Sequence, residues 1–213
     1  MKIYCLGLNE QFLAPEDIPI ASVRFAFFSA VGTWTDEREP CKACGWHWQA
    51  LAPPLLVQWE RSSTEIGDFS WDGPYGTICV VKTSVAERLT KLGFDCHFSA
   101  VDYVKPNKKR RTVPFPYTGP RQLWLQSSPM VDLDMGASGV KLESCCDVCG
   151  DMRYTFRYEG IAIHRDQWNG RKIFRISTNG RADTMFVSEE GLRLLEETGF
   201  TNVQVRAAGE IVD

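Results

Sequence analysis

Two short cysteine motifs carry the residues with the clearest chemistry in this sequence. The first is Cys41-Lys42-Ala43-Cys44-Gly45 and the second is Cys146-Asp147-Val148-Cys149-Gly150. In each motif two residues separate the cysteines, so that one tight turn directs both sulfurs to the same point, and the glycine can take the positive φ that such a turn needs. A Zn²⁺ ion binds four thiolates in a tetrahedron. The two motifs together therefore predict one zinc site, with Cys41, Cys44, Cys146 and Cys149 as its ligands.

Other uses of paired cysteines fit the sequence less well. A thioredoxin-like site has one such motif, after a strand and at the start of a helix, whereas this chain has two. Deaminases combine Pro-Cys-x-x-Cys, which Pro40 and the first motif match, with an upstream His-x-Glu, but the first histidine is His47, after the motif. Four thiolates leave a zinc ion no open position for water. The predicted site is therefore structural, and no catalytic residues are assigned.

The remaining four cysteines receive other roles. Cys145 adjoins Cys146 and could compete with it as a ligand, although the spacing to the glycine favours Cys146. Cys5, Cys79 and Cys96 lie in apolar, strand-like stretches and are predicted to be core residues. Because the N-terminus does not resemble a signal peptide, reduced thiols are expected in preference to a disulfide framework.

The 101 residues between Cys44 and Cys146 must fold so that the second motif returns to the first. Residues 77–81 read as a strand, and a capping box at Ser84–Glu87 starts a helix that ends at Gly93-Phe94. A strand at 185–187, a helix capped by Ser188 and a second Gly-Phe pair at 199–200 repeat this unit. The helices repeat at an offset of 106 residues and the cysteine motifs at 105, which indicates a tandem duplication.

These elements predict an α+β fold, rich in strands, in which a zinc-ribbon-like site of four cysteines joins two related halves. The first half is residues 1–105, a basic and proline-rich linker spans 106–120, and the second half is 121–213, unless all three form one compact domain. Further strands are expected at 2–8, 23–28, 55–59, 122–126, 153–158, 161–164 and 173–177. Removing the zinc is expected to loosen or unfold the molecule.

Charge and composition limit the partners. The net charge is −3, with −4 on residues 1–105 and +1 on 106–213, which argues against nucleic acid as the partner. The basic run at 105–111 is interpreted as a solvated linker, and a phosphate-binding patch is the alternative. No apolar run approaches the ~20 residues that span a bilayer, so we expect no membrane partner and a cytoplasmic location.

Aromatic and acidic residues concentrate in the first half of the chain. Five of the seven tryptophans lie between residues 34 and 71, with acidic residues interleaved. Such side chains could form a surface for a basic partner, or the tryptophans could pack around the zinc turn. Trp46 and Trp48 favour the second interpretation, whereas Trp71 and the glycine-rich segment 72–76 read as an exposed loop. Asp132 and Asp134 share one strand face, where either a metal or solvent could face them.

The sequence resembles the double-CxxCG paralogous family of myxobacteria, in its paired cysteine motifs and in the stretch Val187–Phe200. Members of that family are regarded as immunity proteins of kin-discrimination, or swarming-inhibition, toxin systems, and each binds a cognate protein toxin, often a nuclease. The resemblance implies that this chain neutralises such a toxin by stoichiometric binding and is not an enzyme. It carries over only the four cysteines as metal ligands. A zinc-ribbon nucleic-acid-binding protein is the alternative hypothesis and a metalloenzyme the third, and the sequence is compatible with a homo-oligomer.

Overall fold

Strands dominate the computed structural model, which describes residues 1–7, 25–31, 34–36, 39–46, 49–60, 63–73, 78–105, 113–127, 129–155, 160–177 and 184–213. The strands are β1 (Lys2–Leu6), β2 (Phe28–Ala30), β3 (Trp34–Asp36), β4 (Gln49–Leu51), β5 (Leu55–Trp59), β6 (Phe69–Trp71), β7 (Cys79–Lys82), β8 (Cys96–Tyr103), β9 (Gln122–Ser127), β10 (Met130–Asp132), β11 (Leu142–Cys145), β12 (Met152–Tyr154), β13 (Ile161–His164), β14 (Ile173–Ser177), β15 (Met185–Ser188) and β16 (Val205–Val212). The helices are α1 (Thr83–Lys91), α2 (Arg165–Trp168) and α3 (Glu189–Glu197). The described chain is therefore strand-rich with few helices, as predicted. None of the helices found in these ranges is long and apolar enough to cross a membrane.

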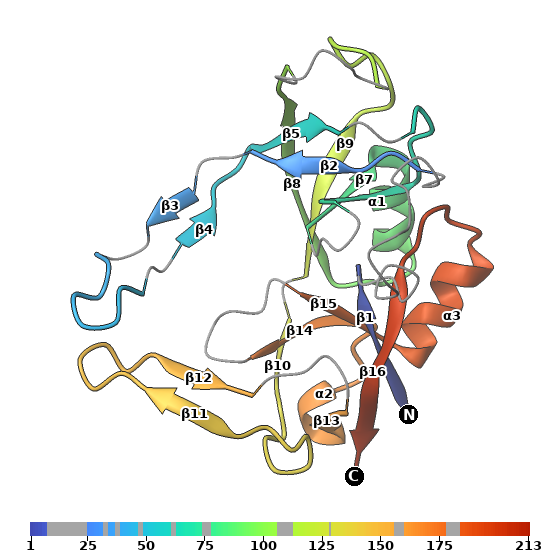
Figure 1. Ribbon diagram of the computed structural model, residues 1–213. Coiled ribbons are helices and arrows are strands. Elements are labelled where there is room, and N and C mark those ends of the chain that lie inside the picture. Colours follow the sequence, from blue (N-terminus) through green and yellow to red (C-terminus); the bar gives the residue numbers. More distant parts are fainter. Residues whose placement is uncertain are drawn as a thin grey trace, which may run out of the picture.

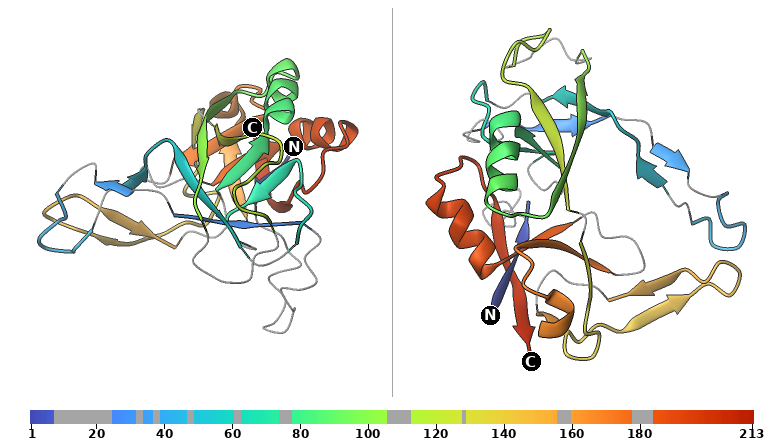
Figure 2. Two further views of the ribbon diagram at one scale, coloured as in Figure 1. Left: turned by 90° about the horizontal axis from the view of Figure 1, so that it is seen from above. Right: turned by 180° about the vertical axis from the view of Figure 1, so that it is seen from behind.

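The strands form two six-stranded sheets and two hairpins. The first sheet has the order β2-β5-β8-β9-β7-β6 and the second β10-β14-β15-β1-β16-β13, while β3 pairs with β4 and β11 with β12. The edge strands of the first sheet approach each other through a parallel bridge between Phe28 and Asp72. In the second sheet, the Asp134 N–H after β10 donates to the Ala162 carbonyl of β13, at 3.1 Å. Each sheet therefore curls towards closure, and the two hairpins project from the side opposite α1 and α3 (Figures 1 and 2).

The two sheets each contain one strand from the other part of the sequence. β1 lies between β15 and β16 in the second sheet, and β9 lies between β7 and β8 in the first. Both inserted strands run antiparallel to their two neighbours, with Tyr4 opposite Val187 and Leu123 opposite Val81. The expected halves, residues 1–105 and 121–213, thus each contribute one strand to the sheet that the other mainly forms.

Alternation along the strands fills three apolar cores, because successive strand residues face opposite sides of a sheet. Phe28, Val80 and Trp124 belong to the core inside the first sheet, and Cys5 and Phe186 to the core inside the second. The opposite faces of the two sheets pack together with α1 and α3 in a shared core. Its buried members are Leu6, Phe69, Trp71, Cys79, Val81, Val85, Ala86, Leu89, Phe94, Leu125, Ile173, Met185, Val187 and Leu195.

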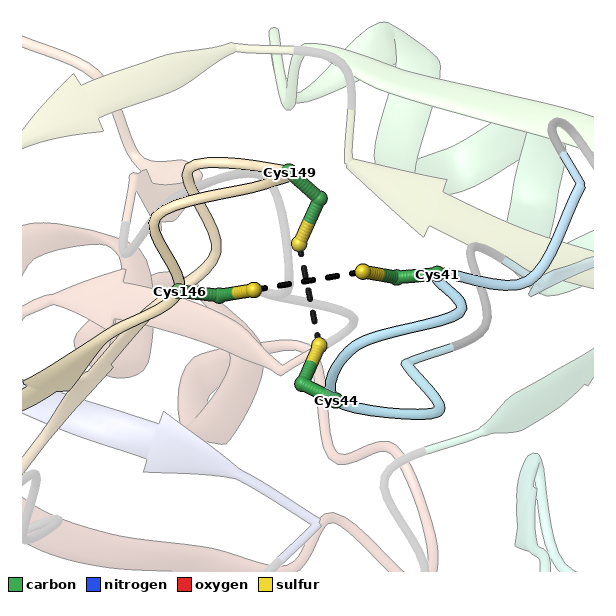
Figure 3. Close-up of side chains that lie close together, drawn as sticks. All are labelled: Cys41, Cys44, Cys146 and Cys149. Atoms are coloured by element: carbon green, nitrogen blue, oxygen red, sulfur yellow. Dashed lines mark hydrogen bonds between the residues drawn. The ribbon is translucent and has the colours of Figure 1, made fainter.

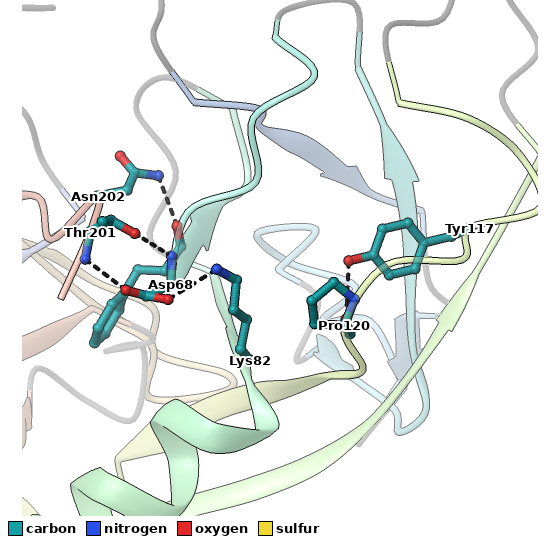
Figure 4. A network of polar contacts seen from close by, with 7 residues as sticks. Asp68, Lys82, Tyr117, Pro120, Thr201 and Asn202 are labelled. Carbon is teal, nitrogen blue, oxygen red and sulfur yellow. Dashed lines mark hydrogen bonds and ion pairs between the residues drawn. The ribbon is translucent and has the colours of Figure 1, made fainter.

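A polar network also ties the chain after α3 to β6 of the first sheet (Figure 4). The Asp68 carboxylate accepts the Thr201 N–H at 2.9 Å and pairs with Lys82 at 3.0 Å. The Asn202 amide donates to the Phe69 carbonyl at 2.8 Å. Burial raises the pKa of Asp68, but the Thr201 N–H and Lys82 outweigh it, so that the pKa lies below its ordinary value. In its ionised form, the carboxylate therefore stabilises the contact between the chain after α3 and the first sheet.

The helix starts follow the predictions only in part. Ser188 caps α3 as predicted, because its hydroxyl accepts the Gly191 N–H at 3.2 Å. The capping box predicted at Ser84 is wrong, because α1 begins one residue earlier and Lys82 occupies its cap without a side-chain hydrogen bond. The Thr83 hydroxyl donates instead to the Arg121 carbonyl at 3.1 Å, next to β9. Strand β7 runs directly into α1, which leaves no extended residue at position 84 to act as a cap.

Several predicted environments can be compared with the structure. Cys5 and Cys79 are fully buried core residues, as predicted. The exposed position predicted for Trp71 is wrong: it is 1% exposed, stacks against Phe69 with ring centroids 6.3 Å apart, and donates its indole N–H to the Asn202 carbonyl. Of the predicted linker, residues 106–112 lie outside the described residues. Later in the linker, Tyr117 packs against the first sheet and donates its hydroxyl to the Pro120 carbonyl at 3.0 Å.

Candidate metal centre

The two cysteine motifs lie at the tips of the two hairpins. We call residues 34–51, with β3 and β4, the first arm, and residues 141–155, with β11 and β12, the second arm. The Gly45 N–H donates to the Cys41 carbonyl at 2.8 Å in the first arm, and the Gly150 N–H donates to the Cys146 carbonyl at 2.8 Å in the second. These glycines have φ values of 68° and 70°, in the left-handed region that glycine tolerates best.

A second hydrogen bond closes each turn at its base. The Cys41 N–H donates to the Trp46 carbonyl at 2.9 Å, and the Cys146 N–H donates to the Asp151 carbonyl at 2.8 Å. Each turn therefore has the same pair of backbone bonds. This turn forms in both places because each motif has two residues between its cysteines and a glycine after them.

The structure brings all four predicted ligands together, as Figure 3 shows. The Sγ atoms of Cys41 and Cys146 lie 3.9 Å apart, those of Cys44 and Cys149 lie 3.7 Å apart, and all four lie within 4.8 Å of one another. Four sulfurs around one Zn²⁺ at ~2.3 Å would be about 3.8 Å apart. A disulfide would need ~2.05 Å. The four cysteines are therefore free thiols in an arrangement that is compatible with a metal site.

Backbone N–H groups and burial act on these thiols in opposite directions. The N–H groups of Cys44 and Ala43 lower the pKa of Cys41 to about 6. The equivalent N–H groups of Cys149 and Val148 lower the pKa of Cys146. Burial and the neighbouring Cys146, Cys41 and Cys44 together raise the pKa of Cys149 to about 12. The pKa of Cys44 is also raised, so that two of the four thiols favour the protonated form. Four negative sulfurs at this separation would need a cation to be stable together, and a divalent metal ion would supply that charge.

The other candidate ligands stay outside this cluster. Cys145 is exposed and does not belong to the four-cysteine group. Asp134 accepts the Ala137 N–H at 2.9 Å and pairs with His164 at 2.9 Å, so it closes a turn after β10. The Ala137 N–H and the nearby His164 hold the pKa of Asp134 below its usual range. The backbone N–H groups that act on the sulfurs of Cys41 and Cys146 were not among the predicted features, although the two-residue spacing of the cysteines already implies them.

The chemistry of this donor set is that of a closed site. Four thiolates saturate a tetrahedral ion, and no fifth side chain joins the group within the described ranges. Such a centre holds two chain segments together and provides no position for a substrate. No protein-family model matches this chain, and a comparison with curated proteins found no match.

Proposed function

We propose that the centre binds one structural Zn²⁺ ion through Cys41, Cys44, Cys146 and Cys149, in the manner of a zinc ribbon whose two turns come from distant parts of the chain. Sulfur separations of 3.7 and 3.9 Å, close to those of a tetrahedral zinc site, support this proposal. The lowered pKa of Cys41 and Cys146 supports it too, because thiolates are the form that binds the metal.

The two halves are, in this proposal, copies of one ancestral unit. The matching strand pairings support this. The Val31 N–H donates to the Leu56 carbonyl at 2.9 Å in the first sheet, and the Asp134 N–H donates to the Ala162 carbonyl in the second. The cysteines that face each other across the centre are separated by 105 residues in both pairs. Each unit then comprises an exchanged strand, a cysteine-tipped arm and a strand-helix-strand element.

The protein acts in this proposal as a cytoplasmic immunity protein, which binds a cognate toxin, often a nuclease, and blocks access to its substrate without catalysing a reaction. The observation that carries the proposal is the four-cysteine cluster itself, because a metal ion bound there would join the two hairpins into a rigid body and leave no coordination site for chemistry. The net charge of −3 supports it as well, since an acidic inhibitor complements the basic cleft of an enzyme that binds a polyanion. The resemblance of the paired motifs to the double-CxxCG family points the same way.

Co-expression with the toxin encoded beside this chain tests the proposal. We expect growth to be rescued and the two proteins to co-purify in a 1:1 complex. A toxin that neither binds nor loses toxicity in the presence of this chain contradicts the immunity function.

A zinc-ribbon nucleic-acid-binding protein is the second candidate function. The run of four basic residues from Lys108 to Arg111 favours it. Tight, salt-dependent binding of DNA or RNA by the isolated protein favours that candidate.

A further inference from the structure

We propose that the two metal-joined arms form the surface that binds the partner, and that this partner presents a basic protein surface. This inference rests on the proposed function and specifies which face carries it out. The arms project from the side opposite α1 and α3 (Figure 2). None of the buried residues that form the three apolar cores comes from the described part of either arm. Leu51, at the base of the first arm, is partly buried and packs against the core inside the first sheet. Beyond that residue, the arms are not needed to complete a core.

The second arm exposes apolar side chains to solvent. All four residues of β11 are exposed. Leu142 is 53% exposed and Val148, inside the cysteine turn, is 73% exposed, which makes them the two most exposed large apolar side chains among the described residues. Two such side chains on one hairpin, Leu142 at the start of β11 and Val148 in the turn at its tip, are suitable anchors for a protein partner, since burying such groups gains free energy.

The strand edge of the same arm is also available. β11 pairs with β12 on one side, and no other strand of the described chain pairs with its second edge. Its outward backbone groups can therefore hydrogen-bond to an extended segment of another protein. A nucleic acid offers no such backbone partner, and the edge thus favours a protein.

The charge of the arms determines the chemistry of that protein. Together the arms contain six acidic and four basic residues, a net charge of −2. A Zn²⁺ ion bound by four thiolates adds about −2. The arms then hold about −4, whereas the remaining residues together hold −1. Negative charge is thereby concentrated in the arms, the second of which carries Leu142 and Val148, and such a charge fits a positively charged cleft and disfavours nucleic acid.

The metal is required for this surface because it fixes the spacing of the arms. At the tips, the sulfurs of Cys41 and Cys146 and those of Cys44 and Cys149 join the two arms. Without the ion, the weak contacts between these sulfurs are left to hold the cysteine turns together. The arms can then separate while the three cores stay intact. Partner binding is therefore expected to depend on the metal more strongly than the fold does.

The experiment compares two matched charge reversals in the full-length zinc-loaded protein. Glu143→Lys changes the second arm, and Glu196→Lys changes the exposed end of α3 on the opposite side by the same two charge units. Leu142→Arg removes the apolar anchor. Binding to the toxin encoded beside this chain is measured by titration calorimetry at low and high salt, with metal content and circular dichroism as checks of folding.

We expect Glu143→Lys and Leu142→Arg each to weaken binding roughly 10-fold or more, and Glu196→Lys to change it less than about threefold. Equal effects of the two charge reversals, or wild-type affinity of both arm variants, overturn the inference while leaving the immunity function standing. A wild-type protein that does not bind the toxin at all overturns both. Chelation of the metal should abolish binding while the circular dichroism spectrum keeps its strand signal.

Discussion

The strand exchange predicts that the two sheets unfold together, and a matched pair of substitutions tests it. Leu6 lies in β1 and Leu125 in β9, the two exchanged strands, and their side chains are 1% and 2% exposed. Both belong to the core that the sheets share. Replacing either with alanine leaves a cavity and is expected to reduce the free energy of unfolding by roughly 3–5 kcal/mol. That is a large fraction of the ~5–15 kcal/mol that stabilises an ordinary domain.

Urea denaturation followed by circular dichroism and by tryptophan fluorescence measures both variants. We expect one coincident transition in each, because β1 stabilises the second sheet and β9 the first, and the shared core connects them. The melting temperature should fall by about 2–4 °C for each kcal/mol lost. Leu142→Ala, at a site that is 53% exposed, is the control and should stay within about 0.5 kcal/mol of the wild type. Two separate transitions, with only one displaced by each core substitution, would refute the reasoning.

Three further predictions each probe a single feature. Ser188→Ala removes the side chain that caps α3 and should reduce the free energy of unfolding, measured by chemical denaturation, by about 1 kcal/mol. Ser84→Ala should leave it nearly unchanged, because Ser84 is not the cap of α1. Similar reductions in the two variants would show that the caps are wrongly assigned. Gly209→Ala should be severely destabilising in a thermal melt, since its added Cβ would lie 1.8 Å from the Ile161 carbonyl oxygen, and a normal melting temperature would contradict the close pairing of β13 and β16. Because the folded pKa of Asp68 is lowered, its ionised form stabilises the protein above its unfolded pKa of about 4, and this stability is lost as the pH falls through the folded value. Asp68→Asn should therefore lower the free energy of unfolding at pH 7 and reduce the loss of stability on acidification. If the free energies of unfolding of the wild type and the variant fall in parallel as the pH is lowered, this role of Asp68 is contradicted.

Local signals in the sequence were sufficient for most individual elements. Residues 55–59 and 173–177 are strands with the predicted bounds, because alternating or continuous apolar residues already favour an extended chain. The spacing of the cysteines was likewise enough to select the four side chains that the structure brings together. In these cases the chemistry and the conformation depend on residues close together in sequence.

Features that depend on distant neighbours could not be predicted. An apolar strand pattern at 2–8 indicates a strand but not that β1 pairs with β15 and β16 at the other end of the chain. The glycines after Trp71 favour a loop at this position of the sequence. In the structure Trp71 lies two residues after Phe69 on β6, stacks against it and belongs with it to the shared core. The Ser84 capping box failed because β7 runs directly into the helix, whose first residue, Thr83, hydrogen-bonds to Arg121 of a remote segment.

The exchange of β1 also has a consequence for biosynthesis. Ile3 pairs with Ser188, 185 residues later, so β1 leaves the ribosome long before either of its neighbours exists. Until then the nascent chain must keep an apolar segment from aggregating, and a chain truncated before β15 lacks both of the strands between which β1 lies. Translation speed and chaperone contact with the emerging N-terminal segment therefore influence the yield of native protein more than they would in a chain whose strands pair in the order of synthesis.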